Sequence, residues 1–184
     1  MIFQLCGLSG AGKSTIARAA QIRLLQRGIE SEIIDGDEYR ETLCKDLTFS
    51  KNDRIENINR LAFVASKFSA HGIIAIICAI NPYEEARKKV SLRYENVRTV
   101  YINCSIPVLQ KRDTKGLYKK AFLSDDHPEK LKNLSGINDP FDIPTRPDLV
   151  INTERLSKEQ CIESFLSFII SEYRNFTNAF KAIA

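Results

Sequence analysis

The sequence predicts an open α/β fold, in which a parallel sheet carries helices on both faces. Three observations support this class. Short apolar runs alternate with segments whose apolar residues recur at helical spacing, and parallel strands need such helical crossovers. Residues 73–80 are apolar on every side, as expected of a central strand that is covered on both faces. A glycine-rich loop separates the first apolar run from the first helical pattern.

The elements of the first quarter follow from local patterns. Residues 2–6 form a short apolar run and predict the first strand. Residues 14–27 show helical spacing until Gly28, which ends the predicted helix. Residues 33–34 predict the end of a second strand, and a brief helix follows them.

The remaining elements are marked by helix-start signals and apolar runs. Residues 50–53 resemble a capping box, which opens a long helix that ends near His71. Residues 97–104 predict another strand, and residues 149–151 predict the last one. A second capping box at residues 157–160 begins the C-terminal helix. Because crossovers between parallel strands are right-handed, these elements assemble into one doubly covered sheet.

The chain is expected to form a single domain across residues 1–184. Residues 113–146 break the pattern, since their apolar periodicity is weak and glycines and prolines punctuate them. An insertion of this length in a compact domain is usually a functional lid, so we call residues 113–146 the lid segment. No internal repeat or second domain is visible in the sequence.

The composition excludes several classes of protein. Charged residues make up 27% and apolar residues 43%, a balance typical of globular domains rather than disordered or fibrous chains. The net charge of +4 is too mild to indicate a nucleic-acid binder. No apolar run approaches the ~20 residues that cross a membrane, and no signal peptide is visible, so a cytoplasmic location is expected. The five cysteines lack C-x-x-C spacing and are predicted to be buried, and two histidines are too few for an ordinary zinc site.

The glycine-rich loop matches the phosphate-binding motif G-x-x-x-x-G-K-[ST] between a strand and a helix. Its backbone N–H groups are expected to face phosphate oxygens beside the positive end of a helix dipole. Lys13 supplies a cation for the β and γ phosphates, and the Ser14 hydroxyl can bind Mg²⁺. The alternative is a glycine-rich turn that only joins strand to helix. The predicted ATP-binding residues here are Gly7, Leu8, Ser9, Gly10, Ala11, Gly12, Lys13, Ser14 and Thr15.

Carboxylates are predicted beside this loop, at the end of the second strand. The strand at residues 73–80 is followed by Asn81, so the usual magnesium-binding carboxylate after that strand is missing, which disfavours a motor or transporter ATPase. Asp35 and Asp37 remain, and in an extended segment they are expected to face the same way. One could hold metal-bound water while the other accepts a proton from a hydroxyl group. The alternative is an Asx turn around Gly36.

Four further motifs follow the phosphate loop along the chain. They are Asp35-Gly36-Asp37-Glu38-Tyr39-Arg40, residues 46–57, Asn81-Pro82-Tyr83 and Arg112-Asp113-Thr114-Lys115-Gly116-Leu117-Tyr118. Together they closely resemble the adenylylsulfate (APS) kinase family, from the phosphate loop to about residue 147, and the resemblance implies a P-loop kinase fold. It also implies that ATP phosphorylates the ribose 3′-hydroxyl of adenosine 5′-phosphosulfate, that Mg²⁺ assists, and that the chain forms a homodimer.

Site roles follow from the resemblance, position by position. It implies that Asp37 and Lys13 are catalytic, that Ser14 and Asp35 serve the metal, and that Arg112 contacts ATP. Arginines offer forked donors to phosphate or sulfate, and an aromatic ring can stack on a base. The implied acceptor-binding residues are Asp37, Arg40, Phe49, Arg54, Asn57, Ile80, Asn81, Lys115 and Leu134.

Two departures from the family pattern affect the acceptor side. Family members commonly carry serine where this chain has Asn81, which cannot accept a phosphoryl group, so direct transfer to the ribose is expected. Leu134 replaces a phenylalanine, which removes a ring from the base sandwich and about 1–3 kcal/mol of stacking. The alternative acceptor is therefore another nucleoside 5′-diphosphate derivative, such as cytidine diphosphoramidate. A non-catalytic nucleotide-binding module ranks lower, and a small GTPase is disfavoured because no N-K-x-D segment is present.

Overall fold

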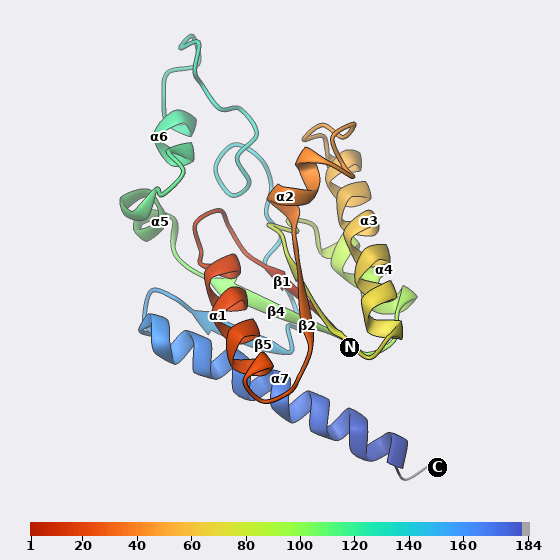
Figure 1. The fold of residues 1–184 in the computed structure, drawn as a ribbon. Coiled ribbons are helices and arrows are strands. Elements are labelled where there is room, and N and C mark those ends of the chain that lie inside the picture. Colours follow the sequence, from red (N-terminus) through yellow and green to blue (C-terminus); the bar gives the residue numbers. More distant parts are fainter. Residues whose placement is uncertain (182–184) are drawn as a thin grey trace.

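Five parallel strands form one sheet in the computed structural model, which describes residues 1–181 (Figure 1). The strands lie in the order β2-β3-β1-β4-β5, so the chain builds first one side of β1 and then the other. This confirms the open α/β class and each expected strand, although β3 ends at Cys78 rather than Ile80. The strands are β1 (Ile2–Cys6), β2 (Ser31–Asp35), β3 (Ile74–Cys78), β4 (Val97–Asn103) and β5 (Leu149–Asn152).

Helices cover both faces of this sheet. The helices of the described chain are α1 (Lys13–Leu25), α2 (Gly36–Glu41), α3 (Lys51–Ala70), α4 (Glu84–Arg93), α5 (Ile106–Arg112), α6 (Leu117–Ala121) and α7 (Lys158–Lys181). The sequence patterns did not predict α4, α5 or α6. Helix α4 buries only Ala86, Arg87 and Val90, so its apolar stripe is too thin to show a helical period.

The core consists of two apolar layers, one on each face of the sheet. Helices α1 and α7 cover one face, where Phe3 of β1 packs edge-to-face on Phe165 at a centroid distance of 6.0 Å. Such aromatic pairs add about 0.5–1.5 kcal/mol beyond the burial of their area. Helices α3 and α4 cover the other face, where Leu61 and Ile77 are buried. Both faces of the sheet are therefore buried, and the loops at its carboxyl edge extend from strands that are packed on both sides.

The two predicted helix starts lie where expected, but only one is a full capping box. The Ser157 hydroxyl accepts from Gln160 N at 3.2 Å, and Gln160 Oε1 accepts from Ser157 N at 2.9 Å. At α3 the Ser50 hydroxyl accepts from Asp53 N at 3.2 Å, but the Asp53 carboxylate binds Thr48 instead of returning to Ser50. The hydrogen bond between Thr48 and Asp53 connects the loop before α3 to the first turn of that helix.

The lid segment rises above the carboxyl edge of the sheet and returns to β5 (Figure 1). The Tyr118 hydroxyl donates to the carbonyl of Ser9 at 2.9 Å, which attaches α6 to the phosphate loop. Gly136 has a φ of 84°, and an added Cβ would lie 2.6 Å from Cδ2 of Leu8. The lid segment therefore packs directly on the phosphate loop, and the positive φ at this contact favours glycine.

All five cysteines are free and buried, as predicted. Burial raises the pKa of Cys6 to about 11 and that of Cys78 to about 12. Both thiols are therefore protonated and unreactive near neutral pH. Within residues 1–181, no helix has the length and apolar character needed to span a membrane.

Candidate active site

The phosphate loop leaves β1 and enters α1 at the centre of the sheet, where the strand order reverses. Any side chain at Gly7 would collide with the Ile102 carbonyl of β4. The start of the loop therefore packs directly against the backbone of β4. Gly10 and Gly12 have φ values of 74° and 104°, which other residues rarely adopt. The loop thus curls ahead of α1, whose positive dipole end favours an anion there.

Lys13 lies inside this curl rather than in solvent. Its side chain is only 9% exposed, and Nζ donates to the carbonyls of Gly7 at 2.8 Å and Leu8 at 2.9 Å. Burial lowers its pKa from 10.5 to about 8. A bound polyphosphate would supply the negative charge that the loop itself lacks, so the site favours an anionic ligand.

Asp35 and Ser14 form a pair of hard oxygen ligands beside Lys13. The Ser14 hydroxyl donates to Oδ2 of Asp35 at 2.7 Å. This pair fits Mg²⁺, which prefers oxygen ligands and usually retains water and substrate phosphates as further ligands. Across the described residues no group of three or more His, Cys, Asp or Glu side chains could hold a metal alone, so most ligands would come from the nucleotide and water.

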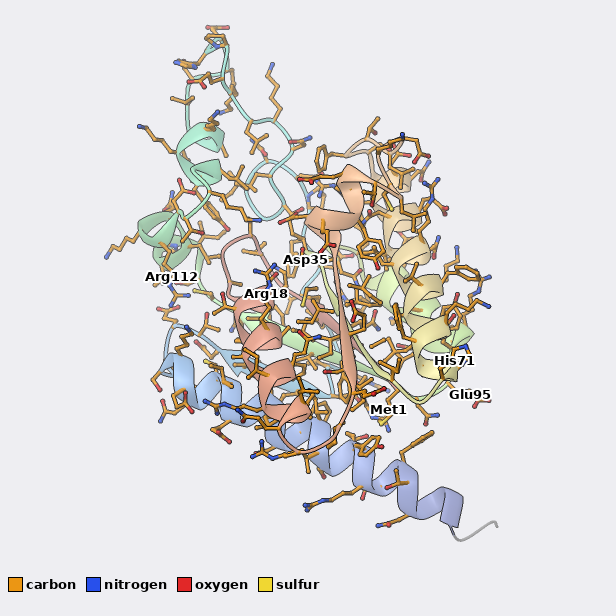
Figure 2. All side chains as sticks on the ribbon, viewed as in Figure 1. Met1, Arg18, Asp35, His71, Glu95 and Arg112 are labelled. Carbon is orange, nitrogen blue, oxygen red and sulfur yellow. The ribbon has the colours of Figure 1, made fainter. Side chains whose placement is uncertain are left out.

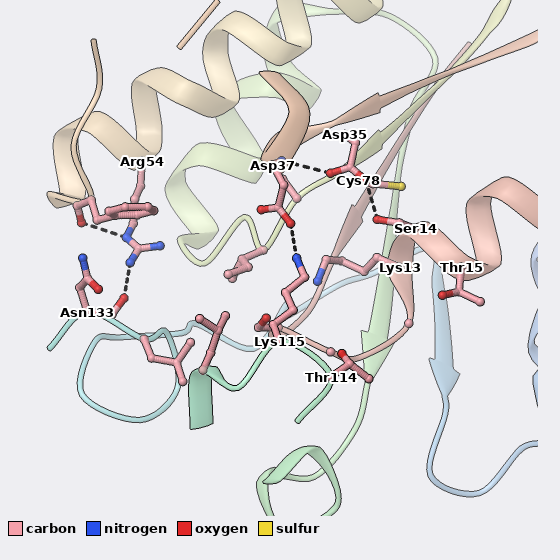
Figure 3. A pocket seen from close by; sticks show the side chains of 18 of the residues that line it. Lys13, Ser14, Thr15, Asp35, Asp37, Arg54, Cys78, Thr114, Lys115 and Asn133 are labelled. Atoms are coloured by element: carbon pink, nitrogen blue, oxygen red, sulfur yellow. Dashed lines mark hydrogen bonds and ion pairs between the residues drawn. The ribbon is translucent and has the colours of Figure 1, made fainter. Parts of the chain in front are cut away.

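The expectation that Asp35 and Asp37 share one extended segment is wrong, although both side chains line the same cavity. Asp35 is the last residue of β2, and its Oδ1 accepts from Asp37 N at 3.1 Å, which caps α2. Asp37 therefore lies in the first turn of α2 and forms an ion pair with Lys115 of the lid segment (Figure 3). The chain starts a helix at Gly36 instead of continuing the strand. The Asp35 carboxylate favours this start because it accepts a hydrogen bond from an N–H group that α2 would otherwise leave unpaired.

Phe49 forms an aromatic wall that two arginines hold in place. The guanidinium groups of Arg40 and Arg54 lie 4.5 Å and 5.2 Å from its ring centroid. Arg54 donates from Nε to the Phe49 carbonyl at 3.0 Å and from Nη2 to the Asn133 carbonyl at 2.6 Å (Figure 3). It also pairs with Asp139 at 2.9 Å. One buried guanidinium therefore links the aromatic wall to the lid segment.

Two buried asparagines lie behind this wall. Asn57 shares the buried face of α3 with Arg54, which lies three residues before it. The Asn81 amide donates to Oε1 of Gln4 at 3.3 Å, and the Asn81 carbonyl accepts from Arg87 at 2.5 Å. Neither Asn57 Oδ1 nor Asn81 Oδ1 has a hydrogen-bond partner among the described residues. Such unpaired buried oxygens are rare and can accept hydrogen bonds from a ligand or water.

Three adjoining cavities combine these groups. The central cavity, of about 360 Å³, contains Lys13 and Asp37. The Arg40 cavity, of about 60 Å³, shares Asp37 and Phe49 with the central one. The Arg112 cavity, of about 220 Å³, shares Gly12 with the central cavity on its other side. Asp37 therefore lines both the central cavity, which reaches the phosphate loop, and the Arg40 cavity.

The structure brings the predicted site residues together. Each of them lines one of the three cavities, apart from Gly7 and Leu8, whose carbonyls hold Lys13. In Figure 2, Arg112 and Asp35 lie on different sides of α1. The residues that sequence reasoning missed are Ile16, Gly36, Ile58, Cys78, Ala79, Pro82, Thr114, Leu117, Leu131, Asn133, Thr153, Leu156, Lys158 and Cys161.

One of the missed residues carried a usable signal. Thr153 follows β5 directly, and ligands of open α/β sheets bind at the carboxyl ends of strands. Leu131 and Asn133 carried none, because the lid segment has little regular structure and its path depends on contacts such as that of Arg54.

Comparison with known sequences gives one consistent family. The family model described as adenylylsulphate kinase matches residues 1–152. An adenylyl-sulfate kinase of Deinococcus deserti is 39% identical over 163 residues, which cover 89% of this chain and 87% of that protein. An adenylyl-sulfate kinase of Microcystis aeruginosa is 41% identical over 158 residues, with coverage of 86% and 84%.

Solved structures agree with the sequence comparison. The APS kinase of Mycobacterium tuberculosis in complex with AMPPNP and APS is 33% identical, with a TM-score of 0.82 and coverage of 94% of this chain and 96% of that one. Shikimate kinase from Acinetobacter baumannii is 19% identical, with a TM-score of 0.56 and coverage of 92% and 93%, and shares the fold alone. The expected P-loop kinase fold is confirmed.

Proposed function

Because this chain belongs to the adenylylsulphate kinase family and is a phosphotransferase, we propose that it phosphorylates the ribose 3′-hydroxyl of adenosine 5′-phosphosulfate with ATP. The observation that carries the proposal is the position of Asp37. Its side chain lines both the central cavity, which reaches the phosphate loop, and the smaller Arg40 cavity, and Phe49 and Arg54 line both as well. A phosphoryl donor in the phosphate loop and an acceptor beside Phe49 can therefore both reach Asp37.

The donor side is assigned to ATP. Its phosphates would lie in the phosphate loop with Lys13, and its base would lie in the Arg112 cavity. Ser14 would bind Mg²⁺ directly and Asp35 through water, which fits their 2.7 Å contact and the preference of this ion for oxygen. Bound Mg²⁺ would offset negative charge on the β and γ phosphates during transfer.

The transfer step is assigned to Asp37. Its carboxylate accepts the proton of the 3′-hydroxyl as that oxygen bonds to the γ-phosphorus, and the bond from phosphorus to the β–γ bridging oxygen breaks. ADP leaves with that electron pair. Asn81 offers no nucleophilic oxygen and its amide faces Gln4, so no covalent phosphoryl-enzyme is needed.

The acceptor side is assigned to the Arg40 cavity and the adjoining part of the central one. Phe49 is half-exposed and can stack on a base. Arg40, Arg54 and Lys115 offer cationic donors to a phosphosulfate. Ile80, Asn81 and Leu134 complete the walls.

The proposed function is tested with a panel of acceptors. Purified protein with saturating ATP and Mg²⁺ is offered adenosine 5′-phosphosulfate, cytidine 5′-diphosphate derivatives and no acceptor, and ADP release is measured. Rapid ADP release only with adenosine 5′-phosphosulfate supports the proposal. Turnover on the cytidine derivatives alone would assign the second acceptor class, which the leucine at position 134 favours because it provides no second ring.

Replacing the ring of Phe49 is expected to weaken acceptor binding. In Phe49→Leu the wall stays apolar but loses base stacking of about 1–3 kcal/mol, so KM for the acceptor should rise about tenfold. KM for ATP should stay near that of the wild type. Phe63→Leu is the matched control, since Phe63 is 51% exposed, against 50% for Phe49, and also lies by a cation. Equal KM values in both variants would contradict the stacking role.

Location and assembly stay predictions. We expect a cytoplasmic protein, since ATP is its donor and its five cysteines are unpaired, as in reducing compartments. We also expect a homodimer, which the family resemblance implies. Sedimentation at several concentrations would measure the assembly, and a purely monomeric protein would contradict it.

A further inference from the structure

Thr153 makes contacts on the donor side that the transfer step above does not use. Its hydroxyl donates to the Ala11 carbonyl in the phosphate loop at 3.0 Å and accepts from Nη1 of Arg112 at 3.1 Å. Its own carbonyl accepts from Nη2 of Arg112 at 2.6 Å. Thr153, the residue that follows β5, therefore connects the phosphate loop to Arg112 in the Arg112 cavity.

Arg112 requires such an anchor because it is exposed. It is the last residue of α5, and an unrestrained arginine in water samples many rotamers. Ordering it on ligand binding would cost about 0.5–1.5 kcal/mol. The two hydrogen bonds to Thr153 hold its guanidinium at the wall of the Arg112 cavity before any ligand arrives.

The chemistry of the Thr153 side chain fits this task closely. A hydroxyl group can donate one hydrogen bond and accept others at the same time. Here the donated bond fixes its orientation on Ala11, which leaves a lone pair for Arg112. Valine has nearly the same shape but provides neither function, whereas serine provides both.

We propose that Thr153 is a positioning residue for the donor nucleotide and acts through Arg112 to preorganise the base side of the site. The proposal rests on the donor half of the proposed function and does not depend on the acceptor. Thr153 touches the carbonyl of Ala11, which is not a phosphate ligand, so its effect should be confined to the base.

The test compares ATP with inorganic triphosphate, which occupies the phosphate loop but has no base. Calorimetric titration of Thr153→Val should give about three- to tenfold weaker ATP binding, which corresponds to one hydrogen bond, and an unchanged triphosphate affinity. Thr153→Ser should restore ATP affinity to within about twofold of the wild type. Equal losses for ATP and triphosphate would overturn the proposal, because they would place the defect in the phosphate loop.

A double-mutant cycle tests the route through Arg112. In an Arg112→Met background, Thr153→Val should weaken ATP binding no further, because the residue that it positions is gone. Additive losses would overturn the proposal. Thermal unfolding of each variant checks that the fold is intact. These titrations contain no acceptor. If the protein did not phosphorylate adenosine 5′-phosphosulfate in the acceptor panel, the acceptor assignment would be refuted, but the result for Thr153 would still hold.

Discussion

The Asp37→Asn variant should lose about 10²- to 10⁴-fold in kcat while retaining most of its affinity for ATP. The amide keeps the shape of the side chain at the start of α2 but cannot accept a proton from the acceptor hydroxyl. It also removes the ion pair with Lys115. In the proposed arrangement ATP is held by the phosphate loop and the Arg112 cavity rather than by Asp37, so its binding should change little. Steady-state kinetics and calorimetric titration measure the two quantities separately.

A neighbouring carboxylate provides the control for this prediction. Glu38 follows Asp37 in α2 and is exposed, but it lines none of the three cavities. Glu38→Gln changes the same charge on the same helix and should retain wild-type kcat. If Asp37→Asn kept kcat within a few-fold of the Glu38→Gln value, Asp37 would not be the proton acceptor.

Local patterns were sufficient for the parts of the fold that depend on neighbours in sequence. The phosphate loop and the starts of α3 and α7 arise from short motifs, and both helix starts close hydrogen bonds within three residues. The five strands were visible as short apolar runs, although their ladders join residues far apart in sequence. Helix α4 escaped prediction because it is amphipathic only weakly: its buried Arg87 reads as polar although it bonds to Asn81 and Asp142. The burial of Arg87 depends in part on the Asp142 carbonyl, 55 residues away, which no local window contains.

The candidate site also has parts that the sequence predicted and contacts that only the folded chain shows. Asp35 could be placed at a strand end from sequence, but the start of α2 directly after it, which puts Asp37 in a helix, was not predicted at that residue. The pairing of Asp37 with Lys115 joins residues 78 positions apart. The resemblance named both residues, yet only the folded lid segment shows that they meet. The same holds for Arg54, whose link to Asn133 could not be deduced from either segment alone.

Removing the Lys13 ammonium is the second change with a large expected effect. Lys13→Met keeps an unbranched side chain in the loop but leaves the β and γ phosphates without their buried cation. We expect kcat/KM for ATP to fall about 10²- to 10³-fold, a loss similar to that of one preorganised donor in other enzymes. Thermal unfolding should show that the variant is folded, since an uncharged side chain of similar length would take the place of a buried charge.

The pH profile distinguishes the charge of Lys13 from its packing. Burial lowers its pKa from 10.5 to about 8, so free enzyme loses the ammonium as pH rises through about 8. In the wild type, kcat/KM for ATP should therefore fall above about pH 8. At saturating ATP, bound phosphates favour the charged form, and kcat should decline only at higher pH. Lys13→Met should lack this step. A wild-type kcat/KM that stays level from about pH 7 to about pH 10 would show that the buried amine keeps its proton without a ligand, and that the phosphate loop carries more negative potential than its carbonyls alone provide.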